Sequence, residues 1–211
     1  MSEAGSDAAR RAGRTFGDFL LFAVTVAELA LLVPLTATFS AADWIYVLQH
    51  LIVLGIAVTR RPPEFMDRSV AAGAAVIVAY AYPYAQVAYL KSVPGTAVWP
   101  DGGLVIVILA AGLSLASLLT LGRRFGVRPA LRGLETGGPY RFVRHPMYLA
   151  YLIADIGYNL QEWNAGTLLL VLAGWGALAY RIRAEERVLS RDGGWPAYAT
   201  AVRYRLVPGV W

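Results

Sequence analysis

Apolar runs long enough to cross a lipid bilayer constrain this chain more than any other feature. A membrane-spanning helix needs about 20 predominantly apolar residues. Four runs meet or nearly meet that length, at residues 16–39, 43–58, 69–90 and 102–121. Two further apolar segments, 146–160 and 165–182, are separated by only a short turn. This pair predicts a helical hairpin, and its first helix is short for a full crossing.

Charge content and length agree with a membrane protein. Only 16% of the 211 residues are charged, whereas soluble domains carry about 25%. We therefore expect an all-α, polytopic integral membrane protein with about four spans and a C-terminal hairpin that carries the functional site. The length suits one membrane domain over 1–211, in which 1–121 form the N-terminal spans and 122–211 form a loop, the hairpin and a C-terminal segment.

The arginines predict how the spans are oriented. Basic residues precede the first run, separate the second from the third, follow the fourth and follow the hairpin. Only Lys91 falls in a connection of opposite parity. By the positive-inside rule, both termini and the arginine-rich loops should be cytoplasmic. The net charge of +5 then indicates contact with anionic lipid headgroups rather than nucleic acid.

Several chemistries are excluded or disfavoured by composition. The chain has no cysteine, which excludes disulfides and a thiol nucleophile. Its two histidines, His50 and His145, lie far apart without zinc-site spacing, so no metal site is expected. The polar, basic N-terminal segment lacks the cleavage pattern of a signal peptide, and none is predicted.

The most informative segment is residues 137–148, Gly-Gly-Pro-Tyr-Arg-Phe-Val-Arg-His-Pro-Met-Tyr. Pro146 suits the first turn of a helix because its missing N–H is no loss there. His145 then lies at the helix start, where free backbone N–H groups favour an anionic ligand group. Gly137 and Gly138 allow a tight turn with backbone close to a ligand. The same residues are equally consistent with a loop in the membrane interface followed by an ordinary helix start that binds no ligand.

A polar stripe follows this helix start. Its members recur at spacings of three and four and so share one helix face: Tyr148, Tyr151, Asp155, Tyr158 and Asn159. An ionisable residue within a membrane helix is costly unless it faces protein or a wet cavity. An aromatic belt with one satisfied aspartate is the alternative, but the depth of Asp155 favours a cavity.

The end of the second hairpin helix combines both charges. Arg181 and Glu185 are four residues apart and can pair on one face, although such runs are commonly solvated helix ends. Beyond them the aromatic residues Trp195, Tyr198, Tyr204 and Trp211 interleave with arginines. This mixture predicts a segment that lies in the membrane interface.

In combination, these patterns resemble a known family. The order G-P-Y-x-x-x-R-H-P-x-Y, an apolar hairpin, R-x-x-x-E-E-x-x-L and a W-x-x-Y segment is similar to the isoprenylcysteine carboxyl methyltransferase family and its prokaryotic relatives. The resemblance runs over residues 121–208, about 40% of the chain. The earlier spans match only in being apolar.

The resemblance implies S-adenosylmethionine as cofactor and a methyl acceptor that enters from the bilayer. Carried over residue by residue, the implied cofactor-binding positions are Tyr140, His145, Pro146, Met147, Tyr148 and Glu185. The stretch Arg132, Gly133, Leu134 and Glu135 matches in position only. Arg181 would lie by the acceptor and share the catalytic assignment with Glu185. From the polar stripe, and not from the resemblance, we expect Tyr151 and Asp155 to be further substrate contacts.

The acceptor and two other functions remain open at this stage. A carboxylate acceptor needs no general base, whereas an amine or thiol must lose a proton. An NADPH-dependent membrane reductase of the sterol reductase type shares a similar His-Pro-x-Tyr hairpin, and a non-catalytic membrane protein is the third reading. The composition is typical of a prokaryotic cell membrane protein whose partners are membrane lipids and a lipophilic or lipid-attached substrate. The sequence does not indicate an oligomeric state.

Overall fold

The computed structural model describes residues 23, 25–27, 30 and 41–211. The predicted first span, 16–39, and the N-terminal arginines lie almost wholly outside these residues, so they stay predictions. The described part is helical, with α2 (Ala41–Thr59), α3 (Val70–Ser92), α4 (Pro100–Leu121), α5 (Pro146–Gln161), α6 (Ala165–Leu189) and α7 (Trp195–Ala201). The prediction of an all-α polytopic membrane protein is confirmed.

Three of the described helices are long and apolar enough to cross a bilayer, at Val70–Ser92, Pro100–Arg124 and Ala165–Leu189. Helix α2 contributes a shorter apolar stretch, Val47–Thr59. Helix α5 has 16 residues, which is about 24 Å of rise against a hydrocarbon core of about 30 Å. The chain is thus an integral membrane protein, and α5 is the short member of its hairpin, as its sequence predicted.

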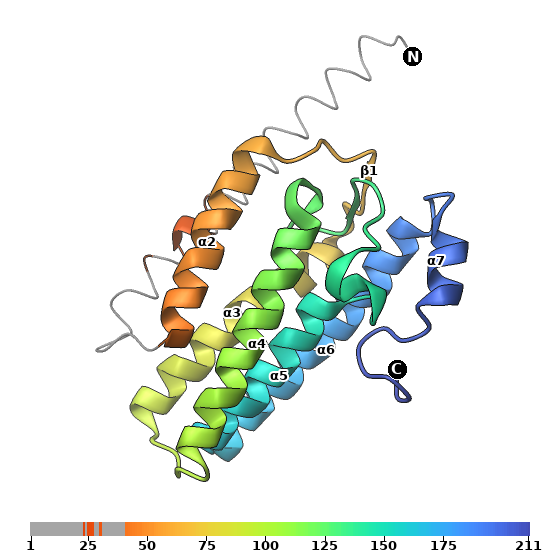
Figure 1. The fold of residues 1–211 in the computed structure, drawn as a ribbon. Coiled ribbons are helices and arrows are strands. Elements are labelled where there is room, and N and C mark those ends of the chain that lie inside the picture. Colours follow the sequence, from red (N-terminus) through yellow and green to blue (C-terminus); the bar gives the residue numbers. More distant parts are fainter. Residues whose placement is uncertain (1–22, 24, 28–29, 31–40) are drawn as a thin grey trace.

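The helices pack mainly as two antiparallel pairs, α4 with α5 and α3 with α6 (Figure 1). Glycines allow the close approach that membrane helices use in place of a hydrophobic driving force. A Cβ on Gly157 of α5 would lie 2.8 Å from the carbonyl oxygen of Gly103 on α4. A Cβ on Gly174 of α6 would lie 2.6 Å from the ring of Tyr82 on α3.

Opposite ends of this bundle carry different connections (Figure 1). At one end, the α3–α4 and α5–α6 turns meet through an isolated bridge between Thr96 and Trp163. At the other end, the two-residue strands β1 (Phe65–Met66) and β2 (Ala130–Leu131) pair antiparallel. The arginine-rich connections of the described part therefore gather at one end, as their parity predicted. That this end is cytoplasmic stays a prediction.

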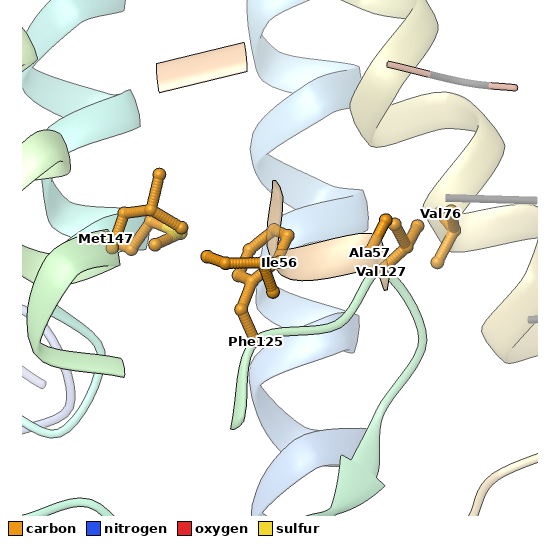
Figure 2. Close-up of a cluster of buried hydrophobic side chains, with 7 residues drawn as sticks. Ile56, Ala57, Val76, Phe125, Val127 and Met147 are labelled. Atoms are coloured by element: carbon orange, nitrogen blue, oxygen red, sulfur yellow. The ribbon is translucent and has the colours of Figure 1, made fainter. Parts of the chain in front are cut away.

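A buried apolar cluster joins α2 and α3 to the loop that follows α4. Its members are Ile56, Ala57, Val76, Leu118, Phe125, Val127 and Met147. Figure 2 shows Phe125 and Val127 of the loop beside Ile56 and Ala57 of α2, with Met147 of α5 on one side and Val76 of α3 on the other. The cluster fixes the loop against the spans, and the candidate site is built around that loop.

Candidate functional site

The loop between α4 and α5 folds over the arginine-rich end of the bundle. It contains two 3-10 turns, η1 (Gly122–Arg124) and η2 (Gly138–Arg141), with β2 between them. Gly138 has φ +50°, and a Cβ there would lie 2.6 Å from Thr120 Oγ1 of α4. Glycine is therefore needed at this position, because the backbone passes close to α4. That the Gly137–Gly138 turn also brings backbone close to a ligand stays a prediction.

The start of α5 is formed as predicted. His145 is the N-cap and Pro146 the first helical residue, and no side chain in the described part caps this turn. The backbone N–H groups of Arg144 and His145 donate to the carbonyl oxygens of Tyr204 and Arg205, each at 2.9 Å. The C-terminal segment therefore holds the helix start in place. The next two N–H groups belong to Met147 and Tyr148, whose side chains face a cavity.

This cavity lies beside the loop and encloses about 870 Å³ of space, part of it open to solvent. We name it the loop cavity. Eleven of the residues assigned from sequence line it: Arg132, Gly133, Leu134, Glu135, Tyr140, His145, Met147, Tyr148, Tyr151, Arg181 and Glu185. Two do not. Pro146 is fully buried within the helix start, because its ring packs in the first turn, and Asp155 lies deeper along α5.

Glu185 projects from α6 toward the start of α5. Its Oε1 accepts a hydrogen bond from the Tyr148 hydroxyl, and its Oε2 lies 3.9 Å from His145 Nδ1. The carboxylate thus faces the loop cavity between the two hairpin helices. A carboxylate placed there can accept hydrogen bonds from hydroxyl or ammonium groups of a ligand.

Arg181 is 4% exposed and lies one helical turn deeper than Glu185. The predicted ion pair between them is long, with 4.0 Å between Arg181 Nη2 and Glu185 Oε1. The guanidinium instead donates to the Val127 carbonyl oxygen at 3.0 Å. It also lies 5.5 Å and 5.3 Å from the ring centres of Tyr80 and Tyr148. Aromatic faces and a carbonyl can hold a buried cation.

Glu186 points away from the loop cavity and forms a separate cluster of charges. Its Oε1 lies 2.9 Å from Arg144 Nη1 and 3.4 Å from His145 Nε2. Its Oε2 accepts from Arg205 Nε at 2.7 Å. The two adjacent glutamates therefore have different surroundings, because successive residues on a helix point about 100° apart. Glu186 ties the helix start to the C-terminal segment.

The C-terminal segment contributes more to the site than the sequence predicted. Trp195 and Tyr198 are buried against Val202, so these two rings pack within the protein. That the segment around them lies in the membrane interface stays a prediction. The Tyr198 hydroxyl donates to the Tyr140 carbonyl oxygen at 2.9 Å. Burial raises the pKa of Tyr198 to about 12 and raises that of Tyr140 further. Both phenols are therefore protonated and neutral at physiological pH.

A second, larger cavity lies within the membrane-spanning part, and we name it the membrane cavity. It encloses about 1860 Å³, part of it open to the outside, and α2, α3, α4, α5 and α6 line it. Asp155 is 5% exposed and lies on its wall. The carboxylate Oδ2 accepts from the Tyr82 hydroxyl at 2.9 Å and from Trp175 Nε1 at 2.7 Å. Four of the five residues of the polar stripe thus line one of the two cavities, as predicted: Tyr148, Tyr151, Asp155 and Tyr158. The fifth, Asn159, instead bonds to the Asp155 carbonyl oxygen and to Thr167.

The two cavities meet. Five residues line both of them: Tyr80, Phe125, Met147, Tyr151 and Arg181. A group held in the loop cavity and a group held in the membrane cavity would therefore face each other beside Arg181. This geometry suits a reaction between a polar reagent from the aqueous side and a lipophilic reagent from the bilayer.

Some lining residues were missed by sequence reasoning. Tyr80 comes from α3, and nothing in its local sequence marks it. Arg144 was used only to predict the orientation of the spans, and Tyr198 only to predict an interfacial segment, although both fall within the motifs that resemble the family. Arg124, Arg128 and Leu189 also line the loop cavity. Among the described residues, no group of three or more His, Cys, Asp or Glu side chains could hold a metal ion.

Comparison with known proteins supports the motif reading. Residues 103–191 match the isoprenylcysteine carboxyl methyltransferase family. The chain is 31% identical over 98 residues to Protein-S-isoprenylcysteine O-methyltransferase A of Arabidopsis thaliana, which is 44% of this chain and 50% of that protein. The B protein of the same plant matches to the same extent.

A third relative bears a different name. The chain is 29% identical over 113 residues to the nickel-cobalt-cadmium resistance protein NccN of Alcaligenes xylosoxydans xylosoxydans, which is 50% of this chain and 52% of that protein. The chain spans about half the length of each of these curated relatives. The family resemblance inferred from the motifs is confirmed, and the reductase alternative gains no support from these matches.

Proposed function

We propose, on the premise that residues 103–191 belong to the isoprenylcysteine carboxyl methyltransferase family, that this chain is a membrane methyltransferase. It takes the methyl group of S-adenosylmethionine and transfers it to a lipid-soluble or lipid-attached acceptor that enters from the bilayer. One observation carries the proposal: Glu185, the uncapped start of α5 and Arg181 line one cavity, and that cavity meets a second one among the spans.

The residues of the loop cavity fit the cofactor's chemistry. The first-turn N–H groups of α5 suit its carboxylate. Glu185 suits its ribose hydroxyls or its ammonium group, and the neutral ring of Tyr140 suits its adenine. Arg124 and Arg128 each have a buried Nε without a partner in the described part, which is consistent with an anionic or acceptor-rich ligand. When bound, S-adenosylmethionine supplies a methyl group already activated by its sulfonium.

The chain's own residues then have three tasks. The loop cavity orients the cofactor at the arginine-rich end. Arg181 orients the acceptor where the cavities meet, with an Nε that has no partner among the described residues. The rings of Tyr80, Tyr148 and Tyr151 keep this junction poor in water. Alignment of two reactants in a dry site can supply most of the rate of such a transfer.

An anionic acceptor group suits Arg181 best, and we propose a carboxylate. A carboxylate oxygen is nucleophilic without losing a proton, so no general base is needed, and none of the described residues that line both cavities is an acid or a histidine. The names of the two plant relatives describe O-methylation of isoprenylcysteine in those proteins. For this chain, a lipid-attached carboxylate is the corresponding proposal.

The test uses the purified full chain in lipid nanodiscs. Adenosylhomocysteine at 100 times its dissociation constant should stabilise the protein by about 2.7 kcal/mol, measured as a rise in melting temperature. Glu185→Gln should reduce this rise, and NADPH should produce none. Stabilisation by NADPH without stabilisation by adenosylhomocysteine would favour the reductase instead. No response to either ligand would favour a non-catalytic protein.

A further inference from the structure

The membrane cavity contains hydrogen-bonding groups that a hydrocarbon chain does not need. Asp155 uses one oxygen, Oδ2, to accept from Tyr82 and Trp175. Its other oxygen, Oδ1, has no hydrogen-bond partner among the described residues, although the residue is 5% exposed and lines the cavity. A carboxylate at this depth in the membrane is energetically costly. An Asp155 oxygen that faces the cavity without a partner therefore needs a physical explanation.

Contacts within the protein account for only one of the two oxygens of the Asp155 carboxylate. Through Oδ2, Asp155 connects α5 to Tyr82 of α3 and to Trp175 of α6. Tyr82 packs closely against Gly174 of α6, so that contact belongs to the α3–α6 packing. Oδ1 is not among the fully buried atoms that lack a partner, so it is accessible from the membrane cavity that Asp155 lines, and a ligand there can reach it.

A second orphaned group lies along the same helix. Gln161 lines the membrane cavity, and its buried Nε2 has no partner in the described part. The wall along α5 therefore offers an acceptor at Asp155, and the unpaired Gln161 Nε2 lies buried next to the same wall. A hydroxyl group on a ligand is able to satisfy either of them, whereas a plain prenyl or acyl chain satisfies neither.

The depth of Asp155 sets where the ligand's donor should be. Asp155 is four residues beyond Tyr151 on α5, and its partner Trp175 is six residues before Arg181 on α6. At 1.5 Å of rise per residue, Asp155 lies about 6–9 Å deeper in the membrane than the junction at Arg181. That separation corresponds to a short stretch of carbon chain beyond the acceptor group.

We infer that the acceptor is an amphiphile with an anionic head at Arg181 and a hydrogen-bond donor, a hydroxyl or an amine, in mid-chain at Asp155. This inference rests on the proposed function and adds the substrate class. Asp155 is then a specificity-determining residue, since it selects an oxygenated or aminated lipid over a plain hydrocarbon one. The hydroxyl or amine of the lipid donates a hydrogen bond to Asp155 Oδ1, whereas a lipid with a plain hydrocarbon chain leaves Oδ1 without a partner.

The experiment measures ligand binding to the full chain in nanodiscs saturated with adenosylhomocysteine. The probes are hexadecanoic acid, its derivatives with a hydroxyl or an amino group on the sixth carbon, and a derivative with the hydroxyl on the third carbon. The wild type should bind one of the sixth-carbon derivatives about tenfold more tightly than hexadecanoic acid, the effect of one good hydrogen bond. The third-carbon isomer should show no such gain.

Two variants separate selection from packing. Asp155→Asn keeps the shape but places an amide at the wall, and the preference for a mid-chain donor should fall about tenfold. Tyr82→Phe removes a donor to Oδ2 and leaves Oδ1 unchanged, so the preference should persist even if stability falls. Equal loss in both variants would assign Asp155 to packing alone.

The wild-type series decides the inference even if Asp155→Asn does not fold. Equal binding of all the acids, or binding of none, overturns the proposed substrate class. Adenosylhomocysteine binding is measured first and separately. Its absence would overturn the proposed methyltransferase function, whereas its presence without any selectivity among the acids would overturn only this inference.

Discussion

The adjacent glutamates Glu185 and Glu186 should give opposite results when each is replaced by glutamine. Glu186 is surrounded by Arg144, His145 and Arg205, whereas Glu185 faces the loop cavity. We expect Glu186→Gln to lower the stability of the ligand-free protein. We expect Glu185→Gln to leave that stability nearly unchanged and to weaken cofactor binding.

The magnitude for Glu186→Gln follows from its contacts. The side chains of Glu186 and Arg144 are each 11% exposed and lie 2.9 Å apart. A hydrogen bond to a charged group contributes about 1.5–3 kcal/mol, and breaking a buried ion pair costs about 3–5 kcal/mol. Because glutamine still offers one acceptor oxygen and Arg205 is 32% exposed, we expect a loss below the top of these ranges, about 2–4 kcal/mol. That corresponds to about 5–15 °C in melting temperature.

The magnitude for Glu185→Gln is small in the ligand-free protein. The glutamine oxygen still accepts from the Tyr148 hydroxyl, and the His145 ring and the Arg181 guanidinium lie 3.9 Å and 4.0 Å away. Ion pairs of that quality contribute about 0–1 kcal/mol. Loss of a charge-assisted hydrogen bond to the cofactor of about 1.5–3 kcal/mol should weaken adenosylhomocysteine binding about 10- to 150-fold.

The assay records melting curves of wild type and both variants, with and without adenosylhomocysteine. Binding is also titrated well below the melting temperatures, so that stability and affinity are read separately. The reasoning is refuted if Glu186→Gln melts like the wild type without ligand. It is also refuted if Glu185→Gln retains the full ligand-induced rise.

Three further predictions address topology, the acceptor and the loop. Single cysteines at Ser92 and Thr200 should react with an impermeant reagent in intact cells only at Ser92, since Thr200 lies at the arginine-rich end; labelling of Thr200 alone would reverse the orientation. Arg181→Lys keeps the charge but loses the planar guanidinium, so turnover should fall at least tenfold while adenosylhomocysteine affinity changes less than threefold; equal loss of both would place Arg181 with the cofactor. Gly138→Ala places a Cβ on a residue with positive φ and against Thr120, so it should lower the stability by about 1–3 kcal/mol. Gly193→Ala is the control, because a Cβ there meets open space. It should melt within 2 °C of the wild type, which corresponds to about 0.5 kcal/mol.

The sequence by itself determined the helices and their parity. In lipid, every backbone polar group must be paired within the segment, so an apolar run of sufficient length has to be helical. The arginine-rich connections gather at one end because two apolar helices separate each of them from the next, and charged side chains stay out of the hydrocarbon core. The position where α5 begins was equally local, because Pro146 suits the first helical position after His145, although hydrogen bonds to the C-terminal segment then hold that start in place.

Sequence also identified most of one wall of the site. The motifs around Tyr140, Tyr148 and Glu185 lie on the hairpin and its preceding loop, and the structure brings them to one cavity. Spacing along a helix predicts which residues share a face. It was therefore enough to distinguish Glu185 from Glu186 by direction.

Only the tertiary structure decided what each of those faces meets. Arg181 was expected to pair with Glu185 on its own helix. It instead donates to the Val127 carbonyl oxygen of a distant loop and lies over the ring of Tyr80 of α3. Glu186 pairs with Arg144 of the loop and with Arg205 of the C-terminal segment. Trp195 and Tyr198 are buried because that segment folds back over the start of α5. Helical periodicity determines the direction of a side chain, but its partners come from segments far away in the sequence, and the energy of a buried charge depends on those partners.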